Sequence, residues 1–150
     1  MGLFDLELQQ QTATRSPRSA VWEVFADIER WPEWNSVCEK VRIIEGTPWT
    51  PGFRFHMVLR MAGRAVPFEP VVVHAEPERV VTWTSTRFTV TGTRTFTLDS
   101  GDGSTLISDT KRFSSPVLPV RLFYPRPVIN RMSEAWLASL AREATRRAEA

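Results

Sequence analysis

Residues 88–114 read F-T-V-T-G-T-R-T-F-T-L-D-S-G-D-G-S-T-L-I-S-D-T-K-R-F-S, and this segment predicts two strands of an antiparallel sheet. Threonine occupies every second position from 89 to 97, and the positions between are mostly apolar. An alternation of period two is typical of a half-buried β-strand whose apolar face lies on the core. The threonines are therefore predicted to face solvent. The residues predicted to face inward are Phe88, Val90, Gly92, Arg94, Phe96 and Leu98.

A hairpin turn follows this strand at Asp102-Gly103, a dipeptide that favours a type I′ turn. Centring the turn there pairs Arg94 with Lys111 across the two strands. The same register places Asp109 opposite Phe96, on the inner face. Three charged side chains are thus predicted on an otherwise apolar face.

Burying an unpaired charge is costly, so the presence of these three side chains has to be accounted for. Either they line a cavity that admits water or a ligand, or they form a closed ion-pair cluster. A register slip of one residue would move Asp109 and Lys111 to the outer face. A further alternative is that Arg94 and Lys111 extend to solvent at the margin of the sheet.

The rest of the chain reads as one domain, residues 1–150, in which helices flank the strands. An alternating start around Phe4–Leu8 predicts a strand. Ser16 is predicted to cap a helix over 17–29 that has Pro17 at its first position, and a short helix or turn follows near Pro32. The further strands are expected at 37–45, 53–62, 65–76, 79–87, 88–99 and 104–114, before a long helix over 128–147. The orientation of strand 65–76 stays open, because three consecutive valines begin at Val71.

The composition of the chain excludes a disordered, a collagen-like and a coiled-coil protein. Of 150 residues, 42% are hydrophobic and 24% charged, which is average for a globular protein. Without a long apolar run or a signal peptide we expect a cytoplasmic protein and no stable membrane insertion. The net charge of +2 comes from scattered arginines, so no nucleic-acid partner is expected. Two histidines and the single Cys38, read as an inert thiol, give no metal-ligand spacing, and no cofactor is expected.

The segment V-W-E-V-F-A-D-I-E-R-W-P-E-W-N, residues 21–35, resembles the SRPBCC superfamily of START-like, Bet v 1-like and polyketide cyclase or lipid-transport-like proteins. The segments T-R-T-F-T-L (93–98) and K-R-F-S-S (111–115) look like the last hairpin of that family. The resemblance implies an α+β helix-grip fold, in which a curved antiparallel sheet of about seven strands wraps around a long C-terminal helix. Many members carry histidine and glutamate where this chain has Arg94 and Lys111, and glycine at Ser115. No catalytic residue is therefore carried over.

The resemblance and the inner face together predict a cavity of about 300 Å³ or more between sheet and helix. The function expected is binding of a hydrophobic or amphipathic small molecule, such as a lipid, polyketide or isoprenoid-like compound. A polyketide cyclase or dehydratase-like enzyme and a regulatory or assembly partner protein are the alternatives. The protein is expected to be a monomer or a homodimer. The residues expected to contact the ligand are Trp34, Phe55, Met57, Leu59, Trp83, Arg94, Phe96, Asp109, Lys111, Met132 and Trp136.

Overall fold

The threonine-rich stretch forms a long hairpin of strands β7 (Val90–Gly101) and β8 (Ser104–Ser114) in the computed structural model, which describes residues 2–149. Arg94 pairs with Lys111, and Phe96 pairs with Asp109, which confirms the predicted register. The predicted turn type is wrong, because a type I′ turn needs a positive φ at both central residues. Only Gly103 has one, at 73°, and Asp102 does not.

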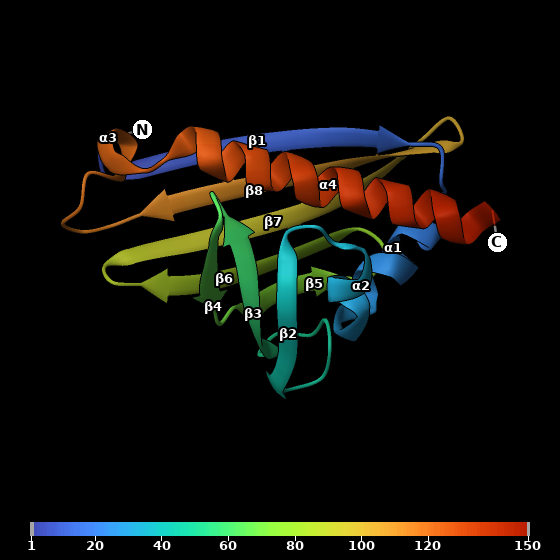
Figure 1. Cartoon of the computed structure of the whole chain (residues 1–150), viewed down its shortest axis with the longest axis horizontal. Helices are drawn as coiled ribbons and strands as arrows, with labels where there is room; N and C mark the ends of the chain where they lie inside the picture. Colours follow the sequence, from blue (N-terminus) through green and yellow to red (C-terminus); the bar gives the residue numbers. More distant parts are fainter. Residues whose placement is uncertain (1, 150) are drawn as a thin grey trace.

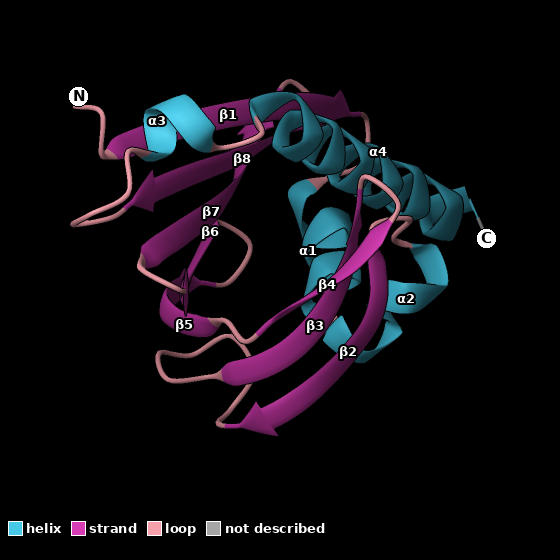
Figure 2. Cartoon of the chain, turned by 60° about the vertical axis from the view of Figure 1, so that its left-hand side comes forward, coloured by secondary structure: helices cyan, strands magenta, loops and turns pink. Residues whose placement is uncertain are grey.

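Eight strands form one antiparallel sheet in the order β1-β8-β7-β6-β5-β3-β2, with β4 beside β3 (Figure 1). The long helix α4 (Arg126–Glu149) lies along the concave side of the sheet, which curls around the interior in Figure 2. This arrangement confirms the helix-grip fold. The remaining elements are β1 (Asp5–Thr14), α1 (Arg18–Ala26), η1 (Ile28–Arg30), α2 (Trp31–Trp34), β2 (Cys38–Glu45), β3 (Arg54–Met61), β4 (Arg64–Phe68), β5 (Val71–Glu76), β6 (Val80–Arg87) and α3 (Val120–Phe123).

The strand predicted over 65–76 is two strands, which is why the sheet has eight strands and not seven. Glu69 and Pro70 separate β4 from β5, since proline cannot donate to a strand ladder. A register shift between Val72 and His74 then lets Val72 be buried while Val73 is exposed. Because of this bulge, the three consecutive valines do not belong to one face.

Two other local predictions are wrong. Phe88 does not face inward: it lies in the β6–β7 turn with φ 59°, and its side chain is 88% exposed. Ser16 does not cap the first helix, which begins at Arg18 with Pro17 as its N-cap and no side-chain cap. Ser16 is buried instead, and its carbonyl accepts a hydrogen bond from the Thr105 hydroxyl at 2.8 Å.

The interior is filled unevenly. One half holds a dense cluster of aromatic rings that come from separate segments: Phe25, Trp31, Trp49, Phe53, Phe55, Trp83, Phe96 and Trp136. A second, smaller core lies beneath α3, where Leu6, Val90 and Val120 meet. The space between these two packed regions is where a cavity forms. No helix within residues 2–149 is long and apolar enough to cross a membrane.

Candidate functional site

A buried cluster of three charged side chains lies on the inner face of the β7–β8 hairpin. Arg94 donates two hydrogen bonds to Asp109, from Nε to Oδ1 at 3.0 Å and from Nη2 to Oδ2 at 2.7 Å. Lys111 donates from Nζ to Oδ2 of the same carboxylate at 2.9 Å and to the Ser133 hydroxyl of α4. Arg94 and Lys111 are each 5% exposed, and Asp109 is 1% exposed. The cations therefore do not extend to solvent, and we call this group the charged trio.

The charged trio holds two cations for one carboxylate. Burial alone would raise the pKa of Asp109, but the charges of Arg94 and Lys111 outweigh it and hold that pKa below its usual value. Burial, together with the positive charge of Arg94, lowers the pKa of Lys111 to about 7, although Asp109 acts in the opposite direction. A guanidinium does not release its proton near neutrality, so Lys111 is the member that does. The trio carries one positive charge below about pH 7 and approaches neutrality above it.

Aromatic rings hold the Arg94 guanidinium in place. Its carbon Cζ lies 4.2 Å from the ring centre of Trp136 and 4.5 Å from that of Phe96. A cation over an aromatic face is attracted to it, more strongly where water is excluded. Asp109 engages Nε and Nη2, and among the described residues Nη1 has no hydrogen-bond partner. Arg94 is thus fixed by two rings and a carboxylate while one nitrogen stays available.

A cavity of about 440 Å³ lies next to the charged trio, between β3, β6, β7 and β8 of the sheet and the start of α4. Its wall is mainly apolar, with Met57, Leu59 and Trp83 from the sheet and Ile129 and Met132 from α4. Arg94 and Lys111 supply charged groups to that wall. An apolar pocket with a few convergent polar groups is typical of a small-molecule site.

The structure brings six of the predicted ligand contacts to this cavity, and five lie elsewhere. The six that line it are Met57, Leu59, Trp83, Arg94, Lys111 and Met132. The five that do not are Trp34, Phe55, Phe96, Asp109 and Trp136. Phe55 and Trp136 both pack on Trp31, with ring centres 5.8 and 5.1 Å away, so rings fill the space where the cavity was predicted to extend. Trp34, at the end of α2, packs against the edge of the same aromatic core.

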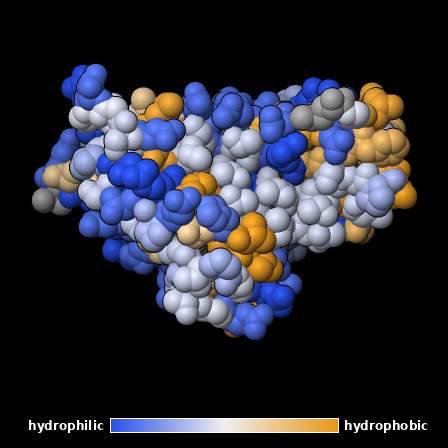
Figure 3. Space-filling model, turned by 180° about the vertical axis from the view of Figure 1, so that it is seen from behind, coloured by the Kyte–Doolittle hydropathy of each residue, from blue (hydrophilic) through white to orange (hydrophobic). Residues whose placement is uncertain are grey.

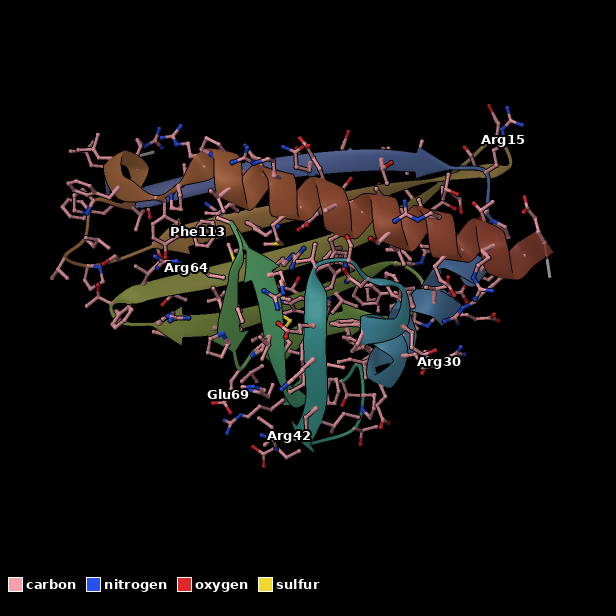
Figure 4. The ribbon with its side chains drawn as sticks, viewed as in Figure 1. Arg15, Arg30, Arg42, Arg64, Glu69 and Phe113 are labelled. Carbon is pink, nitrogen blue, oxygen red and sulfur yellow. The ribbon has the colours of Figure 1, made fainter. Side chains whose placement is uncertain are left out.

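Several lining residues were absent from the predicted set. Phe113 continues the inner face of β8 two residues after Lys111, so the alternation itself could have identified it; Figure 4 labels its side chain at the end of the molecule that carries α3. Ser133 lies on the same helical face as Ile129 and Trp136. A polar residue on this otherwise apolar face could have marked Ser133 as a partner of the buried charges. Tyr124 and Pro125 also line the cavity, but no periodic pattern marks them.

Other side chains able to donate, accept or exchange protons do not join this site. His74 is exposed on the outer side, where its Nε2 lies 3.0 Å from Glu76, and Glu69 is exposed as well. Cys38 is buried, and this burial raises the pKa of its thiol to about 12, in line with the predicted inert thiol. Within residues 2–149, no three histidine, cysteine, aspartate or glutamate side chains group as metal ligands would. The chemical groups that the site does offer are an apolar wall, the fixed guanidinium of Arg94 and the Lys111 amino group with its pKa of about 7.

The sequence was compared with models of known protein families and with curated proteins. A sequence profile of the family described as polyketide cyclase/dehydrase and lipid transport matches residues 8–145. No curated protein matches the sequence.

Solved structures show the same fold at low sequence identity. The Zhui aromatase/cyclase from Streptomyces sp. R1128 superposes with a TM-score of 0.80 at 20% identity, over 96% of each chain. Major latex-like protein 151 from Panax ginseng gives a TM-score of 0.81 at 13% identity, over 94% of this chain and 98% of that one. The di-domain ARO/CYC StfQ from the steffimycin biosynthetic pathway gives 0.81 at 13% identity, with 99% of this chain matched to 54% of that chain.

Proposed function

The chain belongs to the polyketide cyclase/dehydrase and lipid transport family, within the SRPBCC superfamily that its sequence resembles, and we propose that it binds an amphipathic small molecule. The apolar body of the ligand, of lipid, polyketide or isoprenoid-like type, occupies the cavity between Met57, Trp83 and Met132. Its oxygen-rich end meets Arg94 and Lys111. The one observation that carries this proposal is the charged trio, with its surplus positive charge, at the wall of an apolar cavity.

The surplus charge favours an anionic or carbonyl-bearing head group. In a space that excludes water a charge interacts far more strongly than in bulk solvent, so an incoming carboxylate stabilises the two cations. Nη1 of Arg94 is the donor that Asp109 leaves without a partner, and a hydrogen bond between charged groups is among the strongest available. A bound carboxylate would also favour the protonated form of Lys111. Binding of an anionic ligand is therefore expected to be coupled to proton uptake.

The experiment compares decanoate with decanol, which share an apolar chain and differ in charge. Arg94→Met removes the surplus charge and leaves Lys111 paired with Asp109. A lost charged hydrogen bond of about 1.5–3 kcal/mol corresponds to an affinity loss of about 10- to 150-fold for decanoate. The affinity for decanol should change by no more than about twofold. Isothermal titration calorimetry measures both affinities.

Two further measurements sharpen this test. Decanoate affinity of the unsubstituted protein should fall as the pH rises through about 7, because Lys111 then loses its proton. Lys111→Met should abolish this pH dependence, whereas decanol binding should not vary with pH in either protein. Val66→Trp, which fills part of the cavity wall, should weaken both ligands alike. Equal losses for acid and alcohol in Arg94→Met would leave the trio with a structural role only.

A second function, a cyclase or dehydratase, has a specific observation in its favour. Lys111, with its pKa lowered to about 7, lies in the wall of the cavity beside a fixed cation, and a general acid or base works best with a pKa near the operating pH. Such a group could take a proton from the carbon next to a ketone while Arg94 polarises the carbonyl. Incubation with a poly-β-ketone thioester, followed by chromatography, tests this function. A catalyst should form a cyclic product faster than the thioester does without protein, and should lose that advantage in Lys111→Met while still binding the thioester. With a simple carrier the rate does not exceed that of the protein-free control.

A further inference from the structure

One end of the molecule exposes a group of large apolar side chains. Phe88 is 88% exposed, Leu122 is 64% exposed and Phe123 is 68% exposed. In Figure 3 hydrophobic residues cover this end, which is the end that carries α3 and the chain start in Figure 1. We call it the apolar end, and its residues are Leu3, Phe4, Phe88, Val117, Leu122 and Phe123. Exposed apolar side chains that gather in one place mark a surface that contacts something else.

Backbone contacts tie the segments of the apolar end together. Backbone N–H groups of Ser115 and Arg121 donate to the carbonyl groups of Phe4 and Leu3, at 3.1 and 3.0 Å. The Thr89 hydroxyl, next to Phe88, lies 3.0 Å from the Ser115 hydroxyl.

Helix α3 is anchored by Val120 while Leu122 and Phe123 are exposed. Val120 is fully buried in the small core with Leu6 and Val90, and the ring of Tyr124 packs on Phe113 with centres 4.7 Å apart. These contacts fix the backbone on both sides of Leu122 and Phe123, which take no part in either core. Replacing the two exposed side chains should therefore leave the fold intact.

Arginines without acidic partners surround the apolar end. Arg87, Arg121 and Arg126 donate to the backbone carbonyl groups of Pro67, Gly2 and Arg121, respectively. None of the three lies within ion-pair distance of a carboxylate among the described residues. The backbone contacts position these guanidinium groups but leave their charge uncompensated. Asp5, which follows Phe4 in the chain, is exposed at this end as well, but the three arginines outnumber its carboxylate. The end is thus apolar with a surplus of positive charge.

The cavity reaches this same end. Arg87, Tyr124 and Pro125 belong to its lining, and they are chain neighbours of Phe88, Phe123 and Arg126. Arg87 and Pro125 are exposed, and Tyr124 is half-buried, so this part of the lining is accessible from outside. Whatever touches the apolar end also lies beside the way into the cavity.

We propose that the apolar end docks peripherally on the surface of an anionic lipid bilayer. Leu122 and Phe123 enter the boundary between head groups and acyl chains, as the apolar face of an interfacial segment does, and the arginines contact lipid phosphates. A second copy of the chain is a poorer occupant, because a symmetric contact would bring the same uncompensated arginines together. A rigid acidic protein would need hollows to match several separate apolar side chains, whereas lipid adapts to them. The docking does not depend on what the cavity binds.

The test is co-sedimentation with vesicles, either pure phosphatidylcholine or equal parts phosphatidylcholine and phosphatidylglycerol. At about 1 kcal/mol for each arginine near the surface, the anionic vesicles should be preferred by at least about tenfold. Leu122→Ser combined with Phe123→Ser should lower binding to anionic vesicles by at least about tenfold. The matched control, Val73→Ser with Leu106→Ser, removes two apolar side chains that are exposed elsewhere and should bind like the unsubstituted chain.

Further variants distinguish docking on the bilayer from ligand binding in the cavity and from self-association. Arg121→Gln with Arg126→Gln should remove most of the preference for anionic vesicles. Arg94→Met should leave vesicle binding unchanged, so failure of the ligand proposal would not be mistaken for failure of this one. Absence of binding to anionic vesicles would overturn the proposal, as would equal binding by the Leu122→Ser, Phe123→Ser variant. A dimer in size-exclusion chromatography that this variant alone disperses, without vesicle binding, would assign the surface to self-association instead.

Discussion

Asp109→Asn is the substitution that most directly tests the buried charged trio. Asparagine keeps the shape of the side chain but removes the charge that Arg94 and Lys111 share, and it turns one acceptor atom into a donor. Removing one partner of a buried ion pair costs about 3–5 kcal/mol, because the remaining charges lie out of water and unpaired. A domain has about 5–15 kcal/mol of stability, so the loss is a large fraction of it. At this chain length, with about 2–4 °C for each kcal/mol, the midpoint of thermal unfolding should fall by about 6–20 °C.

The cost of Asp109→Asn should also depend on pH, and the sign follows from Lys111. The pKa of Lys111 is already lowered to about 7, and without the Asp109 charge it falls further. At pH values between the lowered Lys111 pKa of the variant and about 7, Lys111 of the folded variant has lost its proton. The unfolded chain and the folded unsubstituted protein still hold this proton. Rising pH therefore stabilises the folded variant in this range, but not the unsubstituted protein. The destabilisation should thus be greatest near pH 5 and smaller at pH 8. Urea unfolding followed by tryptophan fluorescence at both pH values measures it.

A triple variant separates the loss of pairing from the loss of packing. Arg94→Met, Asp109→Leu and Lys111→Met together replace the charges with apolar groups of similar size. Such replacements of buried ion clusters are often neutral or stabilising by about 1–4 kcal/mol. We expect the triple variant to unfold at the same urea concentration as the unsubstituted protein or a higher one. A cost below about 1 kcal/mol for Asp109→Asn, or a triple variant as unstable as the single one, would show that the charges of the trio do not depend on one another for their stability.

Three further predictions concern stability and reactivity. The folding stability should rise as the pH goes from about 7 towards 9, because the unfolded chain still holds the Lys111 proton there and Cys38 does not yet act in the opposite direction. In Lys111→Met this rise should be absent from urea titrations. Cys38, whose pKa is raised to about 12, should resist iodoacetamide at pH 8 in the folded protein, whereas mass spectrometry should find rapid alkylation in urea. Gly46→Ala should cost about 1–3 kcal/mol in thermal unfolding, because φ is 90° there and a Cβ would lie 2.9 Å from Cα of Phe53; Gly101→Ala, which meets nothing closer than 3.6 Å, should cost less.

The β7–β8 hairpin and the charged trio could be predicted from the order of the residues alone. Both follow from local chemistry: side chains of a strand alternate between faces, and a two-residue turn fixes which residues face each other. The pairing of Arg94 with Lys111 was predicted even though the turn at Gly103 has another geometry, because the register depends on the length of the loop. The helix-grip fold followed from the resemblance of residues 21–35 to a known superfamily. The division of the predicted strand 65–76 into β4 and β5 at Pro70 was not predicted. The three valines that follow Pro70 cross a bulge, so they show no alternation that would mark a new strand.

Where the interior is solid and where it is open depends on how distant segments of the chain pack together. Phe55 and Trp136 face inward as predicted, but Trp31 and Trp49 come from other parts of the chain and fill the space beside them. Periodicity reports which face a residue is on, and it cannot report how many rings from distant segments compete for the same volume. The boundary of the cavity at Tyr124 is likewise not predictable from periodicity, because it depends on how α3 packs over β1 and β8. Close packing is a property of the assembled interior, and the cavity is the volume that its side chains leave unfilled.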